Sequence, residues 1–217
     1  MLVETVAEAY DALTEKYLEA GELSEEDILD GLRIGTLRYT FTPVFCGSAT
    51  MNIGVHHLLD YICRCLPSPL DRGKVTGINP KTKESEERAP DESEPFSALV
   101  FKTTSDPYTG KITVFRVYSG VLNSDSTVYN PVRDCEERIG QLYELEGKKQ
   151  KPIKQAVAGD IVAVAKLKET LTGDTLCAKE KPIVFEPIKL PQPVISYAIQ
   201  PKTKNDEDKI HSALQRL

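Results

Sequence analysis

The side chains best suited to hold a metal ion are five cysteines and two adjacent histidines, and their spacing argues against a metal site. Structural zinc sites draw ligands from C-x-x-C pairs, and the sequence contains no such pair. Cys63 and Cys65 are close together, but on a helix their thiols would point to different faces. His56 and His57 would diverge by about 100° on the same helix. We therefore predict reduced thiols, as is usual in the cytosol, and no metal site.

A run of small residues between two apolar segments indicates a second kind of site, one for a bound ligand. Residues 41–46, Phe-Thr-Pro-Val-Phe-Cys, predict a short buried strand. Gly-Ser-Ala follows at residues 47–49, and a helical pattern runs from Val55 until Pro67 stops it. Strand, small-residue turn and helix form an α/β unit, which binds ligands at the carboxyl end of its strand. The tripeptide alone carries little weight, because most such sequences are ordinary turns.

The segment before this unit predicts two helices. Apolar residues recur at spacings of three and four from Val3 to Tyr17, which predicts one helix that Gly21 ends. Ser24 and Asp27 have the spacing of a capping box and predict the start of a second helix. The residues of that helix expected to face inward are Ile28, Leu29 and Leu32. The first helix also carries an acidic ridge, for which periodicity alone favours a solvated face: Glu4, Glu8, Asp11 and Glu15.

Beyond residue 70 the pattern becomes that of a linker followed by strands. Residues 71–95 are rich in charged residues, Pro and Gly, and predict a linker with room for an exposed hairpin. Residues 96–189 contain short apolar stretches separated by turn residues such as Gly173-Asp174. The predicted strands are residues 96–102, 111–118, 127–130, 138–145, 161–167 and 174–178. Several short strands without helices indicate an antiparallel sandwich or barrel, and we favour the barrel.

The last segment predicts an incomplete unit. Residues 194–199 predict a strand, and Asn205 is expected to cap a helix. The apolar residues of that helix are Ile210, Ala213, Leu214 and Leu217. One strand and one helix cannot bury a core, so we expect both ends of the chain to cut through a domain. The predicted fold class is mixed: an α/β part over residues 1–70, an all-β barrel over 96–189 and a short α+β stub over 190–217.

Charge and hydropathy exclude two classes of protein. The net charge of −6 argues against a protein that wraps nucleic acid by bulk electrostatics, although it permits a local basic patch. No apolar run approaches the ~18 residues that span a bilayer. The first residues have no basic region followed by an apolar core, so we expect no signal peptide and a cytoplasmic protein.

Taken in order, short motifs along essentially the whole chain resemble elongation factor G. The last strand, nucleotide motif and helix of its GTP-binding domain are similar to residues 42–49, 52–55 and 66–71. Its second domain is similar to residues 105–111, 115–120, 140–143, 158–161, 167–170 and 172–176. The start of its third domain is similar to residues 193–196 and 199–204. Each motif is weak alone, but the ordered series is specific.

The resemblance implies that the parent protein is a GTPase that moves tRNA and mRNA through the ribosome and binds GTP or GDP with Mg²⁺. In this family, backbone N–H groups of the small-residue turn contact O6 of guanine, which implies a guanine site at Ser48, Ala49 and Thr50. The chain departs from the family at Thr50 and Met51, where relatives often carry a bulkier apolar residue and Lys.

The motifs that bind phosphate in such enzymes are missing. The sequence contains no G-x-x-x-x-G-K-[ST], no Asp-x-x-Gly after a strand and no Asn-Lys-x-Asp. Phosphoryl transfer depends almost wholly on positioning and electrostatics. We therefore expect that this chain alone has no catalytic residues, binds no cofactor and does not hydrolyse GTP.

The resemblance also implies ribosomal partners, and neither membrane nor DNA. Three residues of the acidic ridge, Glu4, Glu8 and Asp11, match positions that the family turns towards the ribosomal stalk protein. The barrel is expected to dock on small-subunit ribosomal RNA, with phosphate contacts available from Lys111, Arg116, Arg133 and Arg138.

Two alternatives remain open. One is a related GTPase, either a ribosome-protection protein or a protein similar to release factor 3. The Asp-Pro-Tyr-Thr-Gly run at residues 106–110 favours elongation factor G over both. The other alternative is a stand-alone barrel that binds RNA or protein. Apolar stripes without partners at both ends of the chain argue against it.

Overall fold

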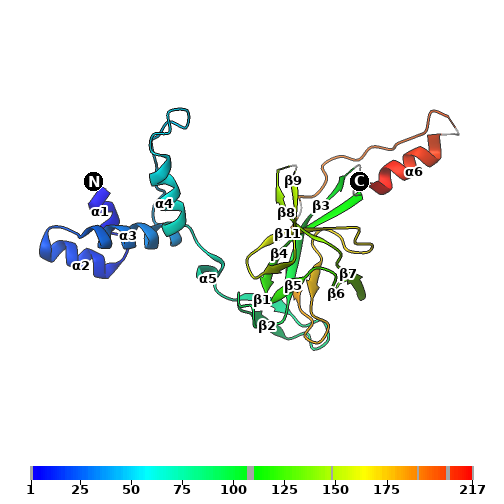
Figure 1. Ribbon diagram of the computed structural model, residues 1–217, viewed down its shortest axis with the longest axis horizontal. Coiled ribbons are helices and arrows are strands. Elements are labelled where there is room, and N and C mark those ends of the chain that lie inside the picture. Colours follow the sequence, from blue (N-terminus) through cyan, green and yellow to red (C-terminus); the bar gives the residue numbers. More distant parts are fainter. Residues whose placement is uncertain (1, 107–109, 148, 190, 204–205, 217) are drawn as a thin grey trace. The chain divides into compact units, whose positions relative to one another are not determined.

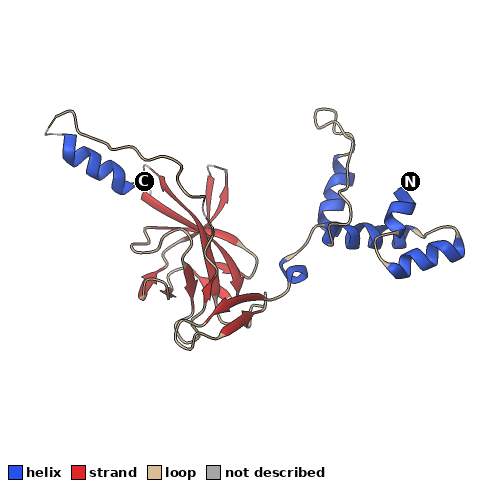
Figure 2. Cartoon of the chain, turned by 180° about the vertical axis from the view of Figure 1, so that it is seen from behind, coloured by secondary structure: helices blue, strands red, loops and turns tan. Residues whose placement is uncertain are grey.

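The computed structural model describes residues 2–106, 110–147, 149–189, 191–203 and 206–216. The chain divides into two compact units, Met1–Arg72 and Gly73–Leu217 (Figure 1). The described part of the first unit is helical, whereas antiparallel strands dominate the second (Figure 2). The predicted mixed fold class is therefore confirmed for the chain as a whole, although the described residues of the expected α/β part, 2–70, form helices and no strand. None of the described helices is long and apolar enough to cross a membrane.

The helices of the first unit are short. They are α1 (Leu2–Ala7), α2 (Asp11–Ala20), α3 (Glu25–Leu37), α4 (Val55–Cys65) and α5 (Pro69–Arg72).

The prediction of one continuous helix from Val3 to Tyr17 is wrong, because the chain turns between α1 and α2. Tyr10 has an extended backbone, with φ −162° and ψ 153°, just before α2. The turn lets both helices contact one glycine of α3. A Cβ atom on Gly31 would lie 2.4 Å from Val6 Cγ1 and 2.7 Å from Leu13 Cδ2. Both of these apolar side chains are almost fully buried, so packing against α3 outweighs the continuity of a single helix.

The two helix signals between α2 and α3 are confirmed. Gly21 ends α2 with a left-handed φ of 74°. At the start of α3, Ser24 Oγ accepts a hydrogen bond from the Asp27 N–H, and the Asp27 carboxylate accepts one from the Ser24 N–H. Lys16 donates to the same carboxylate. The residues of α3 expected to face inward are half-buried: Ile28, Leu29 and Leu32.

The prediction of a buried strand over residues 41–46 is wrong. Val44 is 88% exposed, and no segment of residues 2–72 forms a strand. A strand needs a neighbouring strand to satisfy its backbone groups, and the described part of this unit supplies none. The helix predicted from Val55 is confirmed as α4, although part of its apolar face remains 41–52% exposed: Leu58, Leu59 and Ile62.

The second unit is a β-barrel-like arrangement of antiparallel strands (Figure 1). Its largest sheet has the order β7-β6-β12-β3-β4-β11-β8-β9, and β5 pairs with β10. The strands of the large sheet are β3 (Ser97–Asp106), β4 (Gly110–Ser119), β6 (Thr127–Asn130), β7 (Cys135–Arg138), β8 (Leu142–Glu146), β9 (Lys149–Ile153), β11 (Ile161–Ala165) and β12 (Thr175–Cys177). The separate pair consists of β5 (Val121–Asn123) and β10 (Gln155–Val157).

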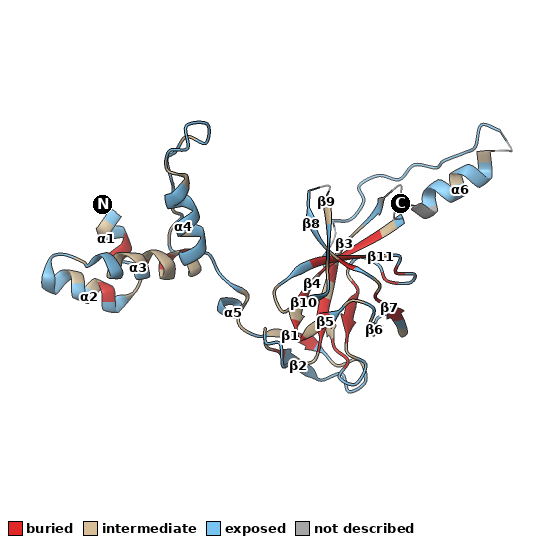
Figure 3. Cartoon of the chain, in the orientation of Figure 1, coloured by how far each residue is buried: buried red, intermediate tan, exposed pale blue. Residues whose placement is uncertain are grey.

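Inward-facing residues of these strands form the main core. Val100, Phe115, Leu142 and Leu176 are fully buried and belong to one apolar cluster. Figure 3 shows buried positions concentrated along the strands, with exposed positions in the connecting loops. Alternate residues of β4 divide between two buried clusters, with Phe115 and Val117 in the main core and Ile112 and Val114 in a smaller cluster.

The prediction of one strand over residues 138–145 is wrong. The region contains the end of β7 and the start of β8, and these strands have different neighbours: β7 pairs with β6, whereas β8 pairs with β9 and β11. Ile139 lies between them and is fully buried in the core cluster. The chain therefore changes direction at a buried residue, between the end of β7 at Arg138 and the start of β8 at Leu142.

The predicted linker at residues 71–95 contains the hairpin for which the sequence left room. Gly77 lies on its first strand, and a Cβ atom there would be 2.5 Å from Ile183 Cγ1. Arg88, which is 5% exposed, donates to the carbonyl of Lys181 at 3.2 Å. The hairpin strands are β1 (Val75–Ile78) and β2 (Ser85–Arg88), and β1 also pairs with β13 (Val184–Phe185). The hairpin therefore packs against the residues that follow β12.

The prediction of a strand over residues 194–199 is wrong. Val194 is fully exposed, and the described residues 191–203 form no strand. As at residues 41–46, no neighbouring strand is described that would pair with this segment. The predicted helix is present as α6 (Glu207–Arg216). The predicted cap Asn205 and the apolar Leu217 lie outside the described residues.

Candidate functional site

Residues 46–54 form a closed loop that ends where α4 begins. Ser48 and Ile53 exchange two backbone hydrogen bonds, each 3.0 Å long. Glycines permit the close approach at both ends. A Cβ atom on Gly47 would lie 2.8 Å from Ile53 O, and Gly54 adopts a left-handed φ of 76°. The loop therefore has a defined shape that depends on small residues.

The tip of this loop presents backbone N–H groups to solvent. The Ser48 N–H donates to Ile53, whereas the described residues supply no acceptor for the N–H groups of Ala49 and Thr50. Both residues are exposed, and the hydroxyl oxygens of Ser48 and Thr50 lie 3.3 Å apart. Such donors, at the tip of the loop that leads into α4, suit a ligand with carbonyl or anionic oxygens. The structure thus places the three predicted guanine-contact residues together, with the backbone donor of Ser48 already used.

The three acidic residues predicted to form one ridge lie on separate elements. Glu4 is on α1, Glu8 is in the turn after α1, and Asp11 is the first residue of α2. All three are exposed. Because the helix is broken at Tyr10, the spacing expected of one continuous helix does not apply to them.

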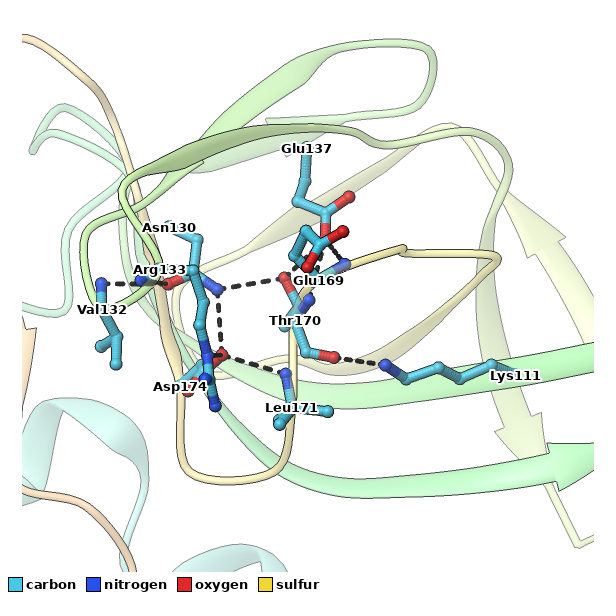
Figure 4. A network of polar contacts seen from close by, with 9 residues as sticks. All are labelled: Lys111, Asn130, Val132, Arg133, Glu137, Glu169, Thr170, Leu171 and Asp174. Atoms are coloured by element: carbon cyan, nitrogen blue, oxygen red, sulfur yellow. Dashed lines mark hydrogen bonds and ion pairs between the residues drawn. The ribbon is translucent and has the colours of Figure 1, made fainter. Parts of the chain in front are cut away.

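In the barrel, a buried carboxylate organises the loop that follows β11 (Figure 4). Glu137 of β7 is 5% exposed. Its carboxylate accepts hydrogen bonds from the N–H groups of Lys168 (3.2 Å), Glu169 (2.8 Å) and Thr170 (2.9 Å), and from the Thr170 hydroxyl (3.0 Å). Burial by itself would raise the pKa of Glu137, but these hydrogen bonds outweigh burial and hold the pKa below its usual value. The carboxylate therefore stays charged and fixes the backbone of residues 168–170.

A second buried carboxylate, Asp174, holds the other end of the same loop (Figure 4). It is 4% exposed and accepts hydrogen bonds from Asn130 Nδ2 and Arg133 Nε, each 3.1 Å long. It also accepts one from the Leu171 N–H at 3.0 Å. Asn130 Nδ2 lies 3.2 Å from the Thr170 hydroxyl as well, so the two carboxylates belong to one network. Since groups of the protein donate to Oδ2 of Asp174 and to both carboxylate oxygens of Glu137, this network stabilises the loop.

The four cations predicted to face RNA have different environments. Lys111 donates to Thr170 O at 2.6 Å, and Arg133 pairs with Asp174, so both take part in the network. Arg116 is half-buried on β4 and Arg138 is exposed on β7, and the described residues supply no ion-pair partner for either. Lys111 and Arg116 are five residues apart on one strand and point to opposite faces. They therefore do not form a single patch.

The described residues contain no group of three or more His, Cys, Asp or Glu side chains that could hold a metal ion. Cys63 is exposed and Cys65 is buried, which places the two thiols in different environments. Burial raises the pKa of the Cys65 thiol. Pro107 and Tyr108, from the Asp-Pro-Tyr run, lie outside the described residues.

Glu137 is not among the residues that the sequence patterns singled out. The sequence offers only alternation as a signal, which puts Glu137 and its neighbour Glu136 on opposite faces of a strand, and the structure makes Glu137 the one buried residue of β7. A charged residue at an inward position of a strand demands partners, since an isolated buried charge is costly. Asp174 was assigned to a turn, and its Leu171 hydrogen bond is indeed local. Its bonds to Asn130 and Arg133 cross more than 40 residues, which no local pattern reveals.

Comparison with known proteins supports the sequence resemblance. Residues 95–179 match the family model of elongation factor G domain 2, and residues 190–217 match that of elongation factor G domain III. A crystal structure of a protein from Thermus thermophilus is similar to this chain, with a TM-score of 0.74 and 29% sequence identity. The match covers 99% of this chain and 30% of that protein's chain.

Proposed function

We propose that this chain, which belongs to the elongation factor G family, is part of a cytoplasmic translational GTPase that moves tRNA and mRNA through the ribosome. The observation that supports this most strongly is the order of the two family matches, domain 2 followed by domain III, along one chain. All strands of the large sheet, from β3 to β12, fall within residues 95–179, the range of the domain 2 match. In this proposal the phosphates of GTP and the Mg²⁺ ion bind the parent protein through residues that this chain does not contain.

Within that protein, the loop of residues 46–54 would contact the guanine base. The N–H groups of Ala49 and Thr50, for which the described part of the chain supplies no acceptor, suit O6 of guanine, and the hydroxyl of Ser48 lies near that of Thr50. Selection of guanine over adenine follows from the chemistry, because adenine has an amino group where guanine has O6. With adenine bound, the N–H groups of Ala49 and Thr50 would face an amino group, which is also a donor, and no hydrogen bond would form.

The guanine contact can be tested in the full-length gene product with the variant Ala49→Pro, which removes one N–H group. One lost hydrogen bond of about 1.4 kcal/mol lowers the preference for GDP over ADP roughly tenfold. Met51→Ala is the matched control, because Met51 is 71% exposed on the same loop and should leave the preference unchanged. Equal preferences in the two variants would exclude the contact.

The chain alone should neither bind nor hydrolyse GTP, because it lacks every phosphate-binding motif. The measurement is phosphate release by the purified 217-residue chain with GTP and Mg²⁺. We expect the rate of buffer alone. Turnover that copurifies with the chain through two different columns would refute this part of the proposal.

Ribosomal contacts are proposed at both units. The exposed Glu4, Glu8 and Asp11 would meet the stalk protein, and the exposed Arg138 is the best placed of the four cations for an RNA phosphate. Lys111 and Arg133 contribute to loop stability first, because they are held by Thr170 and Asp174. Replacement of the three acidic residues by Lys in the full-length protein should weaken stalk-dependent stimulation of GTP turnover. An unchanged rate would exclude this contact and indicate that the three residues only face solvent.

The experiment that tests the whole proposal is the size and sedimentation of the native gene product. An antibody against this chain should detect a band several times larger than 24.1 kDa that moves partly with ribosomes when GTP turnover is blocked. A translocation assay with that product then separates it from a ribosome-protection protein or a protein similar to release factor 3. A native band at 24.1 kDa would instead favour an independent binding module.

A further inference from the structure

The barrel carries a groove of about 370 Å³ whose lining includes neither of the two buried carboxylates. It is bounded by β5, the start of β6 and residues 178–180, which follow β12. Its apolar lining includes Phe96, Leu122 and Val128, which are 3–8% exposed and belong to the main core cluster. Polar residues such as Asn123 and Thr127 line the same groove. The groove therefore combines an apolar floor with a polar rim.

One side of the groove is an open strand edge. β6 pairs with β7 along its whole length but with β12 through a single residue pair, Tyr129 with Cys177. Beyond that pair the chain leaves β6, and the Ala178 N–H donates to Phe96 O at 2.9 Å. Thr127 and Val128 thus have no described strand on that side, and both line the groove. An open edge of this kind can accept an extended peptide by main-chain hydrogen bonds.

The charged lining determines which peptide would fit. Glu136 and Lys179 form an ion pair at the rim. Glu180 is exposed, and no described residue forms an ion pair with it. The lining therefore carries one uncompensated negative charge. A phosphate group would be repelled there, whereas a Lys or Arg side chain would be attracted.

We propose that this groove binds an extended segment of a protein partner in which an apolar side chain is flanked by Lys or Arg. The apolar side chain would cover Leu122 and Val128, the main chain would extend the edge of β6, and a basic side chain would pair with Glu180. The three observations are independent, since they concern hydrophobicity, backbone pairing and charge. Binding of this segment would not require GTP, because every residue that lines the groove belongs to the barrel or to the residues that follow β12.

The test uses the full chain and a fluorescein-labelled heptapeptide, Gly-Lys-Val-Arg-Val-Lys-Gly, in fluorescence anisotropy at 50 and 150 mM salt. We expect saturable binding that persists at the higher salt, and none by a peptide with Glu at each basic position. Glu180→Lys should weaken binding at least fivefold. Thr127→Trp, which fills the groove from an exposed position, should abolish it. Glu146→Lys on β8 is the matched control and should stay within twofold of the unmodified chain, because it lies outside the groove.

Three results would overturn the proposal. The first is absence of saturable binding by the basic peptide. The second is an equal loss with Glu180→Lys and Glu146→Lys, which would indicate attraction to the net negative charge alone. The third is binding of AMP that Thr127→Trp removes, which would make the groove a nucleotide site. Circular dichroism establishes that each variant is folded, and Glu180→Lys tests the groove without filling it.

Discussion

Replacement of Glu137 by Gln should destabilise the barrel far more than the same replacement at the adjacent Glu136. Glu137 is 5% exposed and accepts four hydrogen bonds from the loop after β11. The side chain of Glu136 is 49% exposed and pairs with Lys179 on the surface. The two substitutions are chemically identical, so any difference between them reports the environment.

The expected loss of unfolding free energy in Glu137→Gln follows from the hydrogen bonds that its carboxylate accepts. Hydrogen bonds to a charged group contribute about 1.5–3 kcal/mol each, so the four bonds have a gross value of roughly 6–12 kcal/mol. Burying the carboxylate costs several kcal/mol of this, and Gln keeps one acceptor oxygen while turning a donor towards N–H groups. We expect a net loss of about 2–4 kcal/mol for Glu137→Gln. For Glu136→Gln we expect no more than ~0.5 kcal/mol, the usual value of an exposed pair.

The dependence on pH gives a second measure of the same contacts. The pKa of Glu137 is lowered in the folded state, so its contribution is complete above the unfolded pKa of about 4.5 and is lost as pH falls through the folded pKa. The difference in unfolding free energy between the unmodified chain and Glu137→Gln should therefore shrink between pH 6 and pH 3. A difference that grows with acidity would contradict the assignment.

The assay combines urea unfolding, followed by circular dichroism at the strand signal, with amide hydrogen exchange. In Glu137→Gln the N–H groups of residues 168–170 should exchange faster at pH 7, while those of β3 and β4 remain protected. Equal unfolding free energies for the Glu137 and Glu136 variants, or unchanged exchange in this loop, would refute the view that the buried carboxylate organises it.

Three further predictions concern single contacts. Gly77→Ala should destabilise the chain by about 2 kcal/mol, because the added Cβ would lie 2.5 Å from an isoleucine side chain. Gly140→Ala, with no atom within 4 Å of its Cβ, is the control in urea unfolding. Asp134→Asn should lower the pKa of Tyr129 from about 12 towards 10, since the hydrogen bond to that carboxylate is the main cause of the raised value; absorbance at 295 nm measures it. Ser24→Ala should cost about 1 kcal/mol through loss of the capping box, and unfolding followed at 222 nm should show no loss if the cap contributes nothing.

Much of the fold could be predicted because its signals are local. The capping box at Ser24, the left-handed end of α2 at Gly21 and the strands from residue 96 onward depend on short-range sterics and alternation. The two wrong strand predictions share one cause, which is that a strand also needs a neighbouring strand to pair with. Residues 41–46 and 194–199 have strand-like sequences, yet neither forms a strand in the part of the chain that the structure describes.

The candidate sites divide in the same way. The loop at residues 46–54 could be located from its small residues, because close backbone approach requires them. The sequence could not predict which N–H groups of the loop remain available to a ligand, because this depends on how the loop closes. The Ser48 N–H donates to Ile53 O, whereas the described residues supply no acceptor for the N–H groups of Ala49 and Thr50. The groove beside β6 likewise could not be predicted from the sequence, since it arises where β12 pairs with β6 through only one residue pair.

The sequence by itself determined the family, the barrel-like arrangement and the absence of phosphate-binding motifs, because each is a matter of residue type, order and alternation. Only the tertiary structure decided that Glu137 and Asp174 act from inside the barrel, and that two of the predicted RNA-facing cations are held in their network. The physical reason is that the energy of a charge depends on its burial and its partners. Those partners come from strands and loops distant in sequence, and folding alone brings them together.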